Sequence, residues 1–296
     1  MSNHSFSPAP ALSRFVQSFW TYQSEPRPYA RARGLPSGTA QLVIDLGGDG
    51  LRVPSSSLAG CAPPVSGPTW TRALFNGSDT RYLVEEGDDA VNNIVVDFTP
   101  GGAYPFFGPP EGELRDAHLP LDALWGMRAV DELRDRLRRA QAPAERCQIL
   151  EQALLAHLAR PLERHPAVTL ALRAFAAAPR GPVIAGVVDQ LALSHGRFIQ
   201  VFRDEVGLRP KQFYRVRRFV RVIQRMRNEE RPNWAQLAAD IGYYDQAHLT
   251  RDFQHFAGVS PTVYLRARSA SMPVFLLPPN SDTAAAEAPS LTALTR

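Results

Sequence analysis

The chain has 296 residues, 44% of them apolar and 21% charged, which is the composition of an ordinary globular protein long enough for two domains. It holds no apolar run long enough to cross a bilayer, and its start, MSNHSFSPAP, lacks the basic segment and apolar core of a signal peptide, so we expect a cytoplasmic protein without a membrane partner. Cys61 and Cys147 stand far apart and match no metal-ligand spacing, which argues against a disulfide framework.

Residues 1–160 predict a β-rich domain that ends in a pair of helices. Short apolar runs within LPSGTAQLVIDLGGDG and NNIVVDFTPGGAYPFF lie between glycine clusters, a pattern typical of strands and turns. The earlier segment ALSRFVQSFWTY carries an apolar cluster whose register fits either a helix or the start of a strand. From Val130 onward leucines recur at helical spacing, so we expect helices in the last part of this half.

Residue types that carry catalysis or hold metals are sparse in this half. The histidines are widely separated, and the sequence has no glycine-rich phosphate loop or nucleophile elbow. We therefore expect no catalytic residue, no metal and no cofactor, and a protein that is not an enzyme. A small-molecule effector would bind in a barrel interior, although aromatic residues in a β-domain more often form its core; the candidate lining residues are Trp20, Trp70, Phe98, Tyr104 and Phe106.

A short linker with two prolines, residues 161–168, leads into a second half that contains an internal repeat. Residues 194–210 and 245–261 match at an offset of 51, so that, for example, Phe202 corresponds to Phe253. The segments just before them also match, at an offset of 50. Each copy therefore predicts a helix, a short turn and a second helix.

The ends of the second helices are marked in both copies. Ser194 and Asp245 are capping residues at the start, and Gly207 and Gly258 suit the left-handed conformation that ends a helix. This is the helix-turn-helix pattern, whose second helix can enter the major groove of DNA. The plainer alternative is a four-helix bundle built from a duplicated hairpin.

The side chains left facing outward favour DNA binding over the plain bundle. They are donors that bond base edges and phosphates: His195, Arg197, Gln200 and Arg203 in the first copy, and Gln246, His248, Thr250 and Arg251 in the second. Basic charge is also concentrated here, because residues 166–270 carry 16 Arg or Lys against 8 Asp or Glu. We expect the basic run between Arg209 and Arg231 to form a phosphate-facing stripe.

The segment between the two copies predicts one long helix from Pro210 to about Arg227. At 1.5 Å per residue this helix is about 27 Å long, close to the separation of about 34 Å between successive major grooves on one face of a duplex. A stiff connector of this length can serve both units without dimerisation. A last helix is expected from Ser260-Pro261 to Arg268, and a disordered tail over residues 269–296.

Residues from about 183 to 266 resemble the AraC-type DNA-binding domain, in which two helix-turn-helix units are joined by a long helix. The second unit carries the more specific signal, because IGYYDQAHLTRDFQHFAGVSPTVY contains the glycine, the Asp-Gln pair, the Arg-x-Phe step and the Gly-x-x-Pro exit of the family signature. The first unit departs from the family at Gly196 and Ile199, where larger or polar base-reading side chains are usual. The resemblance implies a sequence-specific transcription regulator that binds double-stranded DNA, with RNA polymerase as a candidate partner.

The front half resembles the divergent, cupin-like sensor domain that often precedes such DNA-binding domains. The resemblance rests on VDFTPGGA at residues 96–103 and LPLDALWG at residues 119–126. It implies a β-barrel or sandwich that modulates DNA binding, followed by a helical pair. That pair is a candidate homodimer surface, and packing onto its own domain is the alternative.

The expected fold class is therefore α+β. A β-rich sensor domain occupies residues 1–160, the linker residues 161–168, and an all-α domain with two helix-turn-helix units residues 169–268. Within the DNA-binding surface we expect Arg251 to bond guanine, with Gln246 or His248 assisting. Other side chains should mainly hold phosphates: Arg203, Lys211 and Arg215.

Two other functions remain open from the sequence. Gly196 and Ile199 in the first recognition helix favour a non-specific, architectural DNA binder. A DNA-repair enzyme with an AraC-type passenger domain would need a reactive cysteine in a Pro-Cys-His-like context or a four-cysteine zinc site. Neither Cys61 nor Cys147 supplies one.

Overall fold

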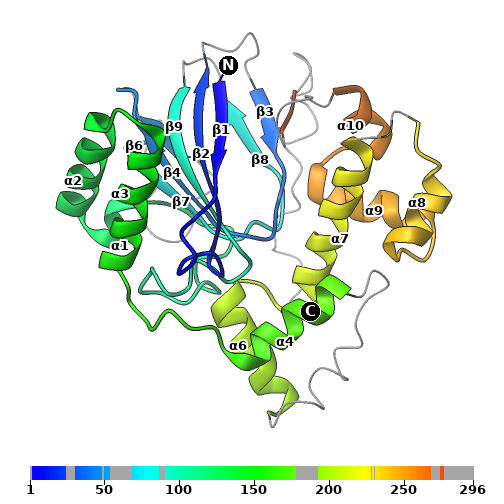
Figure 1. Ribbon diagram of the computed structural model, residues 1–296. Coiled ribbons are helices and arrows are strands. Elements are labelled where there is room, and N and C mark those ends of the chain that lie inside the picture. The colour runs from blue at the N-terminus through cyan, green and yellow to red at the C-terminus, as the bar shows by residue number, and fades with distance from the viewer. Residues whose placement is uncertain are drawn as a thin grey trace, which may run out of the picture.

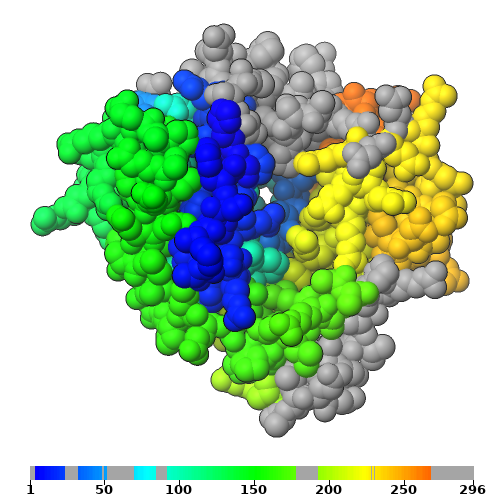
Figure 2. Space-filling model, viewed as in Figure 1, coloured from blue at the N-terminus to red at the C-terminus, as the bar shows by residue number. Residues whose placement is uncertain are grey.

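The computed structural model describes residues 2–24, 31–48, 50–53, 69–86, 91–177, 193–227, 229, 231–267 and 274–276. An N-terminal half made of antiparallel sheets lies beside a helical C-terminal half (Figure 1). The space-filling view shows the helices packed beside and below the sheets on this face of the molecule (Figure 2). The predicted α+β class is confirmed.

The N-terminal domain is built on a six-stranded antiparallel sheet in the order β1-β2-β9-β4-β7-β10. The apolar cluster of ambiguous register enters this sheet as a strand, because Phe19 lies opposite Val96 and both side chains are buried. The strands of this sheet are β1 (Ser2–Phe6), β2 (Val16–Ser24), β4 (Gln41–Asp45), β7 (Ala73–Asn76), β9 (Val91–Phe98) and β10 (His118–Pro120).

Two smaller antiparallel sheets complete this half. One pairs β5 (Leu51–Val53) with β6 (Thr69–Thr71). The other has the order β11-β3-β8 and consists of β3 (Arg31–Gly34), β8 (Leu83–Glu86) and β11 (Val274–Leu276). Within the tail predicted to be disordered, Val274–Leu276 pair with β3.

Three helices follow the sheet: α1 (Asp122–Trp125), α2 (Met127–Arg139) and α3 (Pro143–Ala156). The apolar faces of α2 and α3 pack into the same core as the six-stranded sheet, with Leu137 and Leu154 fully buried. Arg134 of α2 also donates to the backbone carbonyl and the carboxylate of Asp45 in β4, at 2.7 and 2.8 Å. The leucine-rich helices therefore pack onto their own domain.

The C-terminal helices are α4 (Pro166–Ala177), α6 (His195–Val206), α7 (Pro210–Arg227), α8 (Trp234–Ile241), α9 (Gln246–Ala257) and α10 (Pro261–Ala267). They share one apolar core, in which the ring of Phe202 lies 5.8 Å from that of Phe175 and 5.7 Å from that of Phe213. Helix α4 begins inside the expected linker, since Pro166 is favourable in a first helical turn.

The N-terminal domain contacts the C-terminal ends of both α6 and α9. At α6, the backbone N–H of Glu111 donates to the carbonyl of Asp204 at 2.8 Å, and the hydroxyl of Ser78 donates to that of Val206 at 3.2 Å. At α9, the buried Arg33 of β3 donates to the carbonyl of Ala257 at 3.1 Å. The last carbonyls of a helix have no partner within the helix, so these bonds satisfy groups that would otherwise need water.

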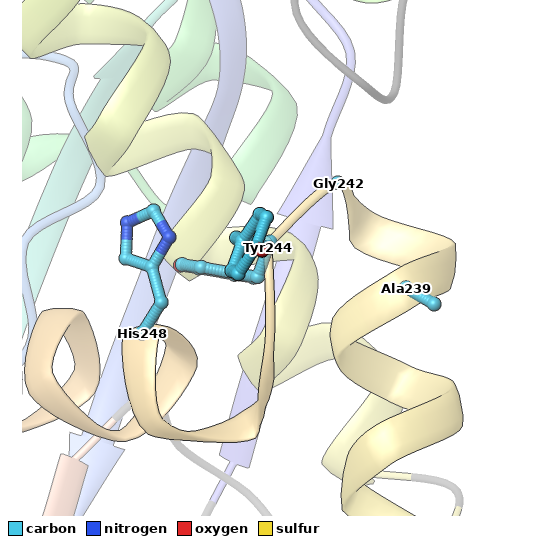
Figure 3. A pocket seen from close by; sticks show the side chains of 5 residues that line it. Ala239, Gly242, Tyr244 and His248 are labelled. Carbon is cyan, nitrogen blue, oxygen red and sulfur yellow. The ribbon is translucent and has the colours of Figure 1, made fainter.

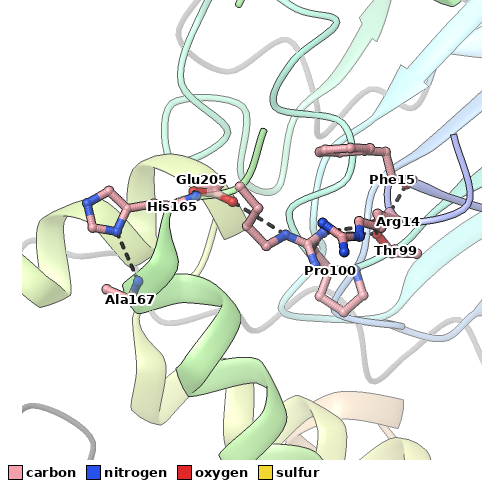
Figure 4. A network of polar contacts seen from close by, with 8 residues as sticks. Arg14, Phe15, Thr99, Pro100, His165, Ala167 and Glu205 are labelled. Carbon is pink, nitrogen blue, oxygen red and sulfur yellow. Dashed lines mark hydrogen bonds and ion pairs between the residues drawn. The ribbon is translucent and has the colours of Figure 1, made fainter. Parts of the chain in front are cut away.

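A buried acidic cluster lies at the contact with α6. Glu205 of α6 accepts a hydrogen bond from the backbone N–H of His165 at 3.1 Å and faces the guanidinium of Arg164 at 3.4 Å (Figure 4). Arg164 in turn donates to the carbonyl of Pro100 in the N-terminal domain at 2.9 Å. The carboxyl of Glu111 is buried close by, near enough for the charge of Glu205 to act on it.

Burial raises the pKa of both carboxyl groups, because a charge is poorly solvated inside the protein. The pKa of Glu111 rises to about 8, to which the charge of Glu205 adds. The pKa of Glu205 rises to about 7, although the His165 hydrogen bond and the Arg164 charge oppose the rise. The folded protein therefore binds more protons than the unfolded chain between about pH 4.5 and pH 8.

The stability of the protein should fall as the pH rises through this range. The contribution of these groups is complete below the ordinary glutamate pKa of 4.5 and is lost as the pH passes about 7 and then about 8. Glu111→Gln should reduce the slope of the free energy of unfolding against pH by at most about 1.4 kcal/mol per pH unit. Thermal unfolding at pH 6, 7, 8 and 9 and constant ionic strength measures it.

The matched control is Glu132→Gln, which removes an exposed carboxylate of α2 that is paired with Arg128. It should leave the slope between pH 6 and pH 9 unchanged. An unchanged slope in Glu111→Gln as well would contradict the assignment.

Candidate nucleic-acid interface

The second helix-turn-helix unit consists of α8, a turn and α9. The side chain of Asn233 accepts a hydrogen bond from the backbone of Gln236 and caps α8, and that of Asp245 accepts from His248 and caps α9. Between them Gly242 has φ of 89°, a left-handed conformation that glycine adopts at little cost. Local sequence thus fixes both ends of the turn.

The two predicted recognition helices have the same form. Helices α6 and α9 each contain 12 residues, each begins after a side-chain cap and each ends at a left-handed glycine. The corresponding inward residues Phe202 and Phe253 are both buried. The internal repeat is therefore confirmed for these helices. The expected first helix of the first unit, with Val187, Val188 and Leu191, lies outside the described residues.

A buried arginine of the connector helix α7 holds the second unit together. Arg218, only 7% exposed, donates to the carbonyl of Gly242 at 3.1 Å and to the carboxylate of Asp252 at 2.8 Å. Its guanidinium also lies 3.9 Å from the ring centre of Tyr243. Burial alone would raise the pKa of Asp252, but the bonds and charges of Arg215 and Arg218 lower it, so the carboxylate stays ionised.

The sequence did not single out this network. Its one signal was an acidic residue, Asp252, beside the inward-facing Phe253 of a helix otherwise rich in donors. Arg218 resembled the rest of the basic run, because its partners lie 24 and 34 residues further along the chain.

On α9, two of the four predicted DNA-binding side chains are exposed. Gln246 and Arg251 extend into solvent, and Thr250 is partly buried. The half-buried His248 points back toward the connector, with its Nε2 3.4 Å from the guanidinium of Arg218. The structure therefore leaves Gln246 and Arg251 most free to reach base edges.

On α6 the predicted residues divide between the two ends of the helix. His195 and Arg197 are exposed in the first turn. Gln200 instead donates to the carboxylate of Asp204 at 2.7 Å, and the partly buried Arg203 packs against Gly112 of the N-terminal domain. Of these four described residues, the two in the first turn of α6 are the exposed ones.

More basic side chains of α7 than predicted bond groups of the protein itself. Lys211 is exposed, but Arg215 donates to the carboxylate of Asp252 at 2.8 Å. Arg218 is buried, and Arg221 donates to the carbonyl of Phe175 at 2.7 Å. Arg218 and Arg221 of the expected phosphate-facing stripe therefore bond groups of the protein itself. The contacts of Arg203, Lys211 and Arg215 with phosphate stay predictions.

The five aromatic residues expected to line an effector cavity lie in different surroundings. Phe98 and Phe106 are fully buried in the N-terminal core with their ring centres 6.0 Å apart. Trp70 is half exposed on β6, and the ring of Tyr104 packs under the guanidinium of Arg160. Trp20 donates its indole N–H to Ser18 at 2.8 Å. The lining of an effector cavity by these residues stays a prediction.

Two properties of the described ranges bear on other functions. None of their helices is long and apolar enough to span a membrane. Within the same ranges, no three His, Cys, Asp or Glu side chains gather as metal ligands would.

Comparisons with known proteins agree with the geometry of the C-terminal half. Residues 187–267 match the family described as a helix-turn-helix domain, and residues 4–120 match a domain of unknown function (DUF6597). No curated protein matches the chain.

Solved structures of ToxT from Vibrio cholerae are similar over most of the chain. One covers 90% of this chain and 97% of ToxT at 11% identity, with a TM-score of 0.42. Another, wild-type ToxT of strain SCE256 bound to an unsaturated fatty acid, covers 83% and 94% at 10% identity, with a TM-score of 0.46.

Capped helices with exposed donors, together with the helix-turn-helix match, define the class: the protein is a DNA-binding transcription regulator. More particularly, residues 187–267 match a helix-turn-helix domain of the AraC type, and they follow a region, residues 4–120, that matches the DUF6597 domain.

Arg218→Met should destabilise the second unit strongly. Removing one partner of a buried ion pair costs about 3–5 kcal/mol, and the lower end applies here because Asp252 retains Arg215. The free energy of unfolding from a urea titration measures the loss. Arg225→Met is the control, since its exposed pair with Asp240 at 3.6 Å should contribute less than about 1 kcal/mol. Equal losses in the two variants would refute the role of Arg218.

Proposed function

We propose that the protein binds specific duplex sequences by placing α6 and α9 in successive major grooves, and that its N-terminal domain modulates this binding. The observation that supports the proposal best is the matched pair of 12-residue helices separated by the 18-residue helix α7. At 1.5 Å per residue α7 is about 27 Å long, a length suited to two units on one face of a duplex.

The two helices contribute unequally in this proposal. Helix α9 presents Gln246 and Arg251, and a guanidinium can bond both O6 and N7 of guanine. Helix α6 presents His195 and Arg197 in its first turn, while Gln200 is engaged with Asp204. Most of the sequence discrimination should therefore come from the second unit, with the first unit gripping phosphates.

One observation favours the architectural alternative for the first unit. Gly196 lies in the exposed first turn of α6 with no atom near the position of a side chain, so this helix start offers little to a base edge. If both units gripped only phosphates, preferred and random duplexes would be bound alike.

The N-terminal domain is suited to modulate binding because it holds both recognition helices by their C-terminal ends. Its contacts with Asp204, Val206 and Ala257 leave the first turns of α6 and α9 exposed. A change in this domain, such as the binding of an effector, could alter the spacing of the two helices without covering either. Contact with RNA polymerase and formation of a homodimer complete the proposal as further partners.

Arg251→Ala and Lys211→Ala should weaken DNA binding in different ways. Loss of a base contact by Arg251 should cost about 1–3 kcal/mol on the preferred duplex and relax specificity. Loss of a phosphate contact by Lys211 should weaken preferred and random duplexes alike and reduce the salt slope by about one. Titrations of both duplexes at several salt concentrations test this. Identical behaviour of the two variants would contradict the assigned roles.

Arg33→Ala should loosen the second unit from the N-terminal domain, because it removes the bond to Ala257. The wild-type protein should prefer a duplex whose two recognised sequence blocks lie one helical turn apart over a duplex in which one block is moved by half a turn. In Arg33→Ala this preference should fall about 5-fold or more. Binding to a duplex with the second block alone should not change. Arg128→Ala on the exposed face of α2 is the control. An unaltered spacing preference in Arg33→Ala would show that the N-terminal domain does not set the spacing.

A further inference from the structure

The turn before α9 presents one aromatic side chain to solvent. Tyr244 is 93% exposed, whereas the adjacent Tyr243 is only 5% exposed and lies under the guanidinium of Arg218. Within the described part of the chain Tyr244 has no hydrogen bond or ring contact. Its ring is therefore available to a ligand.

The backbone around Tyr244 is fixed even though its side chain is free. The N–H of Gly242 donates to the carbonyls of Ala238 and Ala239, and that of Tyr243 donates to Ala238 at 2.8 Å. On the other side Asp245 caps α9. An aromatic ring on a rigid backbone loses little conformational freedom on binding.

Tyr244 also forms part of a shallow pocket between α8 and α9. The pocket is lined by uncharged surface of Ala239, Gly242, Tyr243 and Tyr244 and by His248, which rises from the first turn of α9 (Figure 3). Among the described residues that line this pocket there is no carboxylate, and the adjacent Asp245 accepts the backbone N–H of His248 as the cap of α9.

The position of Tyr244 relative to Gln246 identifies what it would meet on DNA. The first turn of a recognition helix points at base edges, and the major groove is about 12 Å wide, so its sugar-phosphate borders lie about 6 Å from the centre. Tyr244 precedes Gln246 by two residues, outside the helix, and is thus placed toward a border rather than toward the bases.

We propose that Tyr244 contacts the DNA backbone at the edge of the groove read by α9, with its ring against a deoxyribose and its hydroxyl donating to a phosphate oxygen. Tyrosine is one of the side chains that make such contacts. This inference rests on the proposed function and adds to it a positioning contact that fixes the register of α9 on the duplex.

Tyr244→Phe and Tyr244→Ala test the proposal. Loss of the hydroxyl should weaken binding of preferred and random duplexes alike by about 10-fold, the lower end of the effect of a hydrogen bond to a charged group. Loss of the ring should weaken it further by a similar factor. The salt slope should not change, because a neutral phenol displaces no cation. In ethylation interference, ethylation of one phosphate beside the second block should inhibit DNA binding by the wild-type protein but not by Tyr244→Phe.

Met127→Ala, which removes a 68% exposed apolar side chain from α2, is the matched control and should bind as the wild type does. Unchanged binding and interference in Tyr244→Phe would overturn the phosphate contact, and a changed base preference would overturn the backbone assignment. If Arg251→Ala still lost binding in those cases, the proposed function would stand while this inference failed. Wild-type protein that bound no duplex would instead refute both.

Discussion

The position of the second recognition helix depends on one buried cation. Arg218 lies on the connector α7, yet it bonds the carbonyl of Gly242 in the turn and the carboxylate of Asp252 in α9. A charge is stable inside a protein only with such partners, so connector, turn and recognition helix must keep their places together. The connector thus orients the second unit as well as separating it from the first.

The N-terminal domain holds α6 of the first unit and α9 of the second unit in place. It bonds the last carbonyls of α6 and of α9, and it places the buried Glu111 beside Glu205 and Arg164 at the first of these contacts. Because both recognition helices are held at their C-terminal ends, their first turns remain open to DNA. The contacts with the N-terminal domain and the exposed first turns therefore lie at opposite ends of these helices.

The helical half could be predicted well because its signals are local. Caps, terminal glycines and apolar spacing predicted α6, α7 and α9 within one or two residues. The N-terminal register could not be settled, since pairing of β2 with β9 joins segments about 80 residues apart. The same limit applies to the candidate site. The sequence predicts Arg215 and Arg218 as part of a phosphate-facing stripe because Asp252, which pairs with both, lies 37 and 34 residues away.

The measurement that tests the central claim most directly is selection of preferred sites from random duplexes by the full chain at about physiological salt, where specific and non-specific binding separate. The account predicts a motif of two blocks about one helical turn, about 34 Å, apart. The more strongly enriched block should be the one whose selection Arg251→Ala relaxes. No enrichment, or a single block with no dependence on a second, would contradict the claim that α6 and α9 occupy successive major grooves.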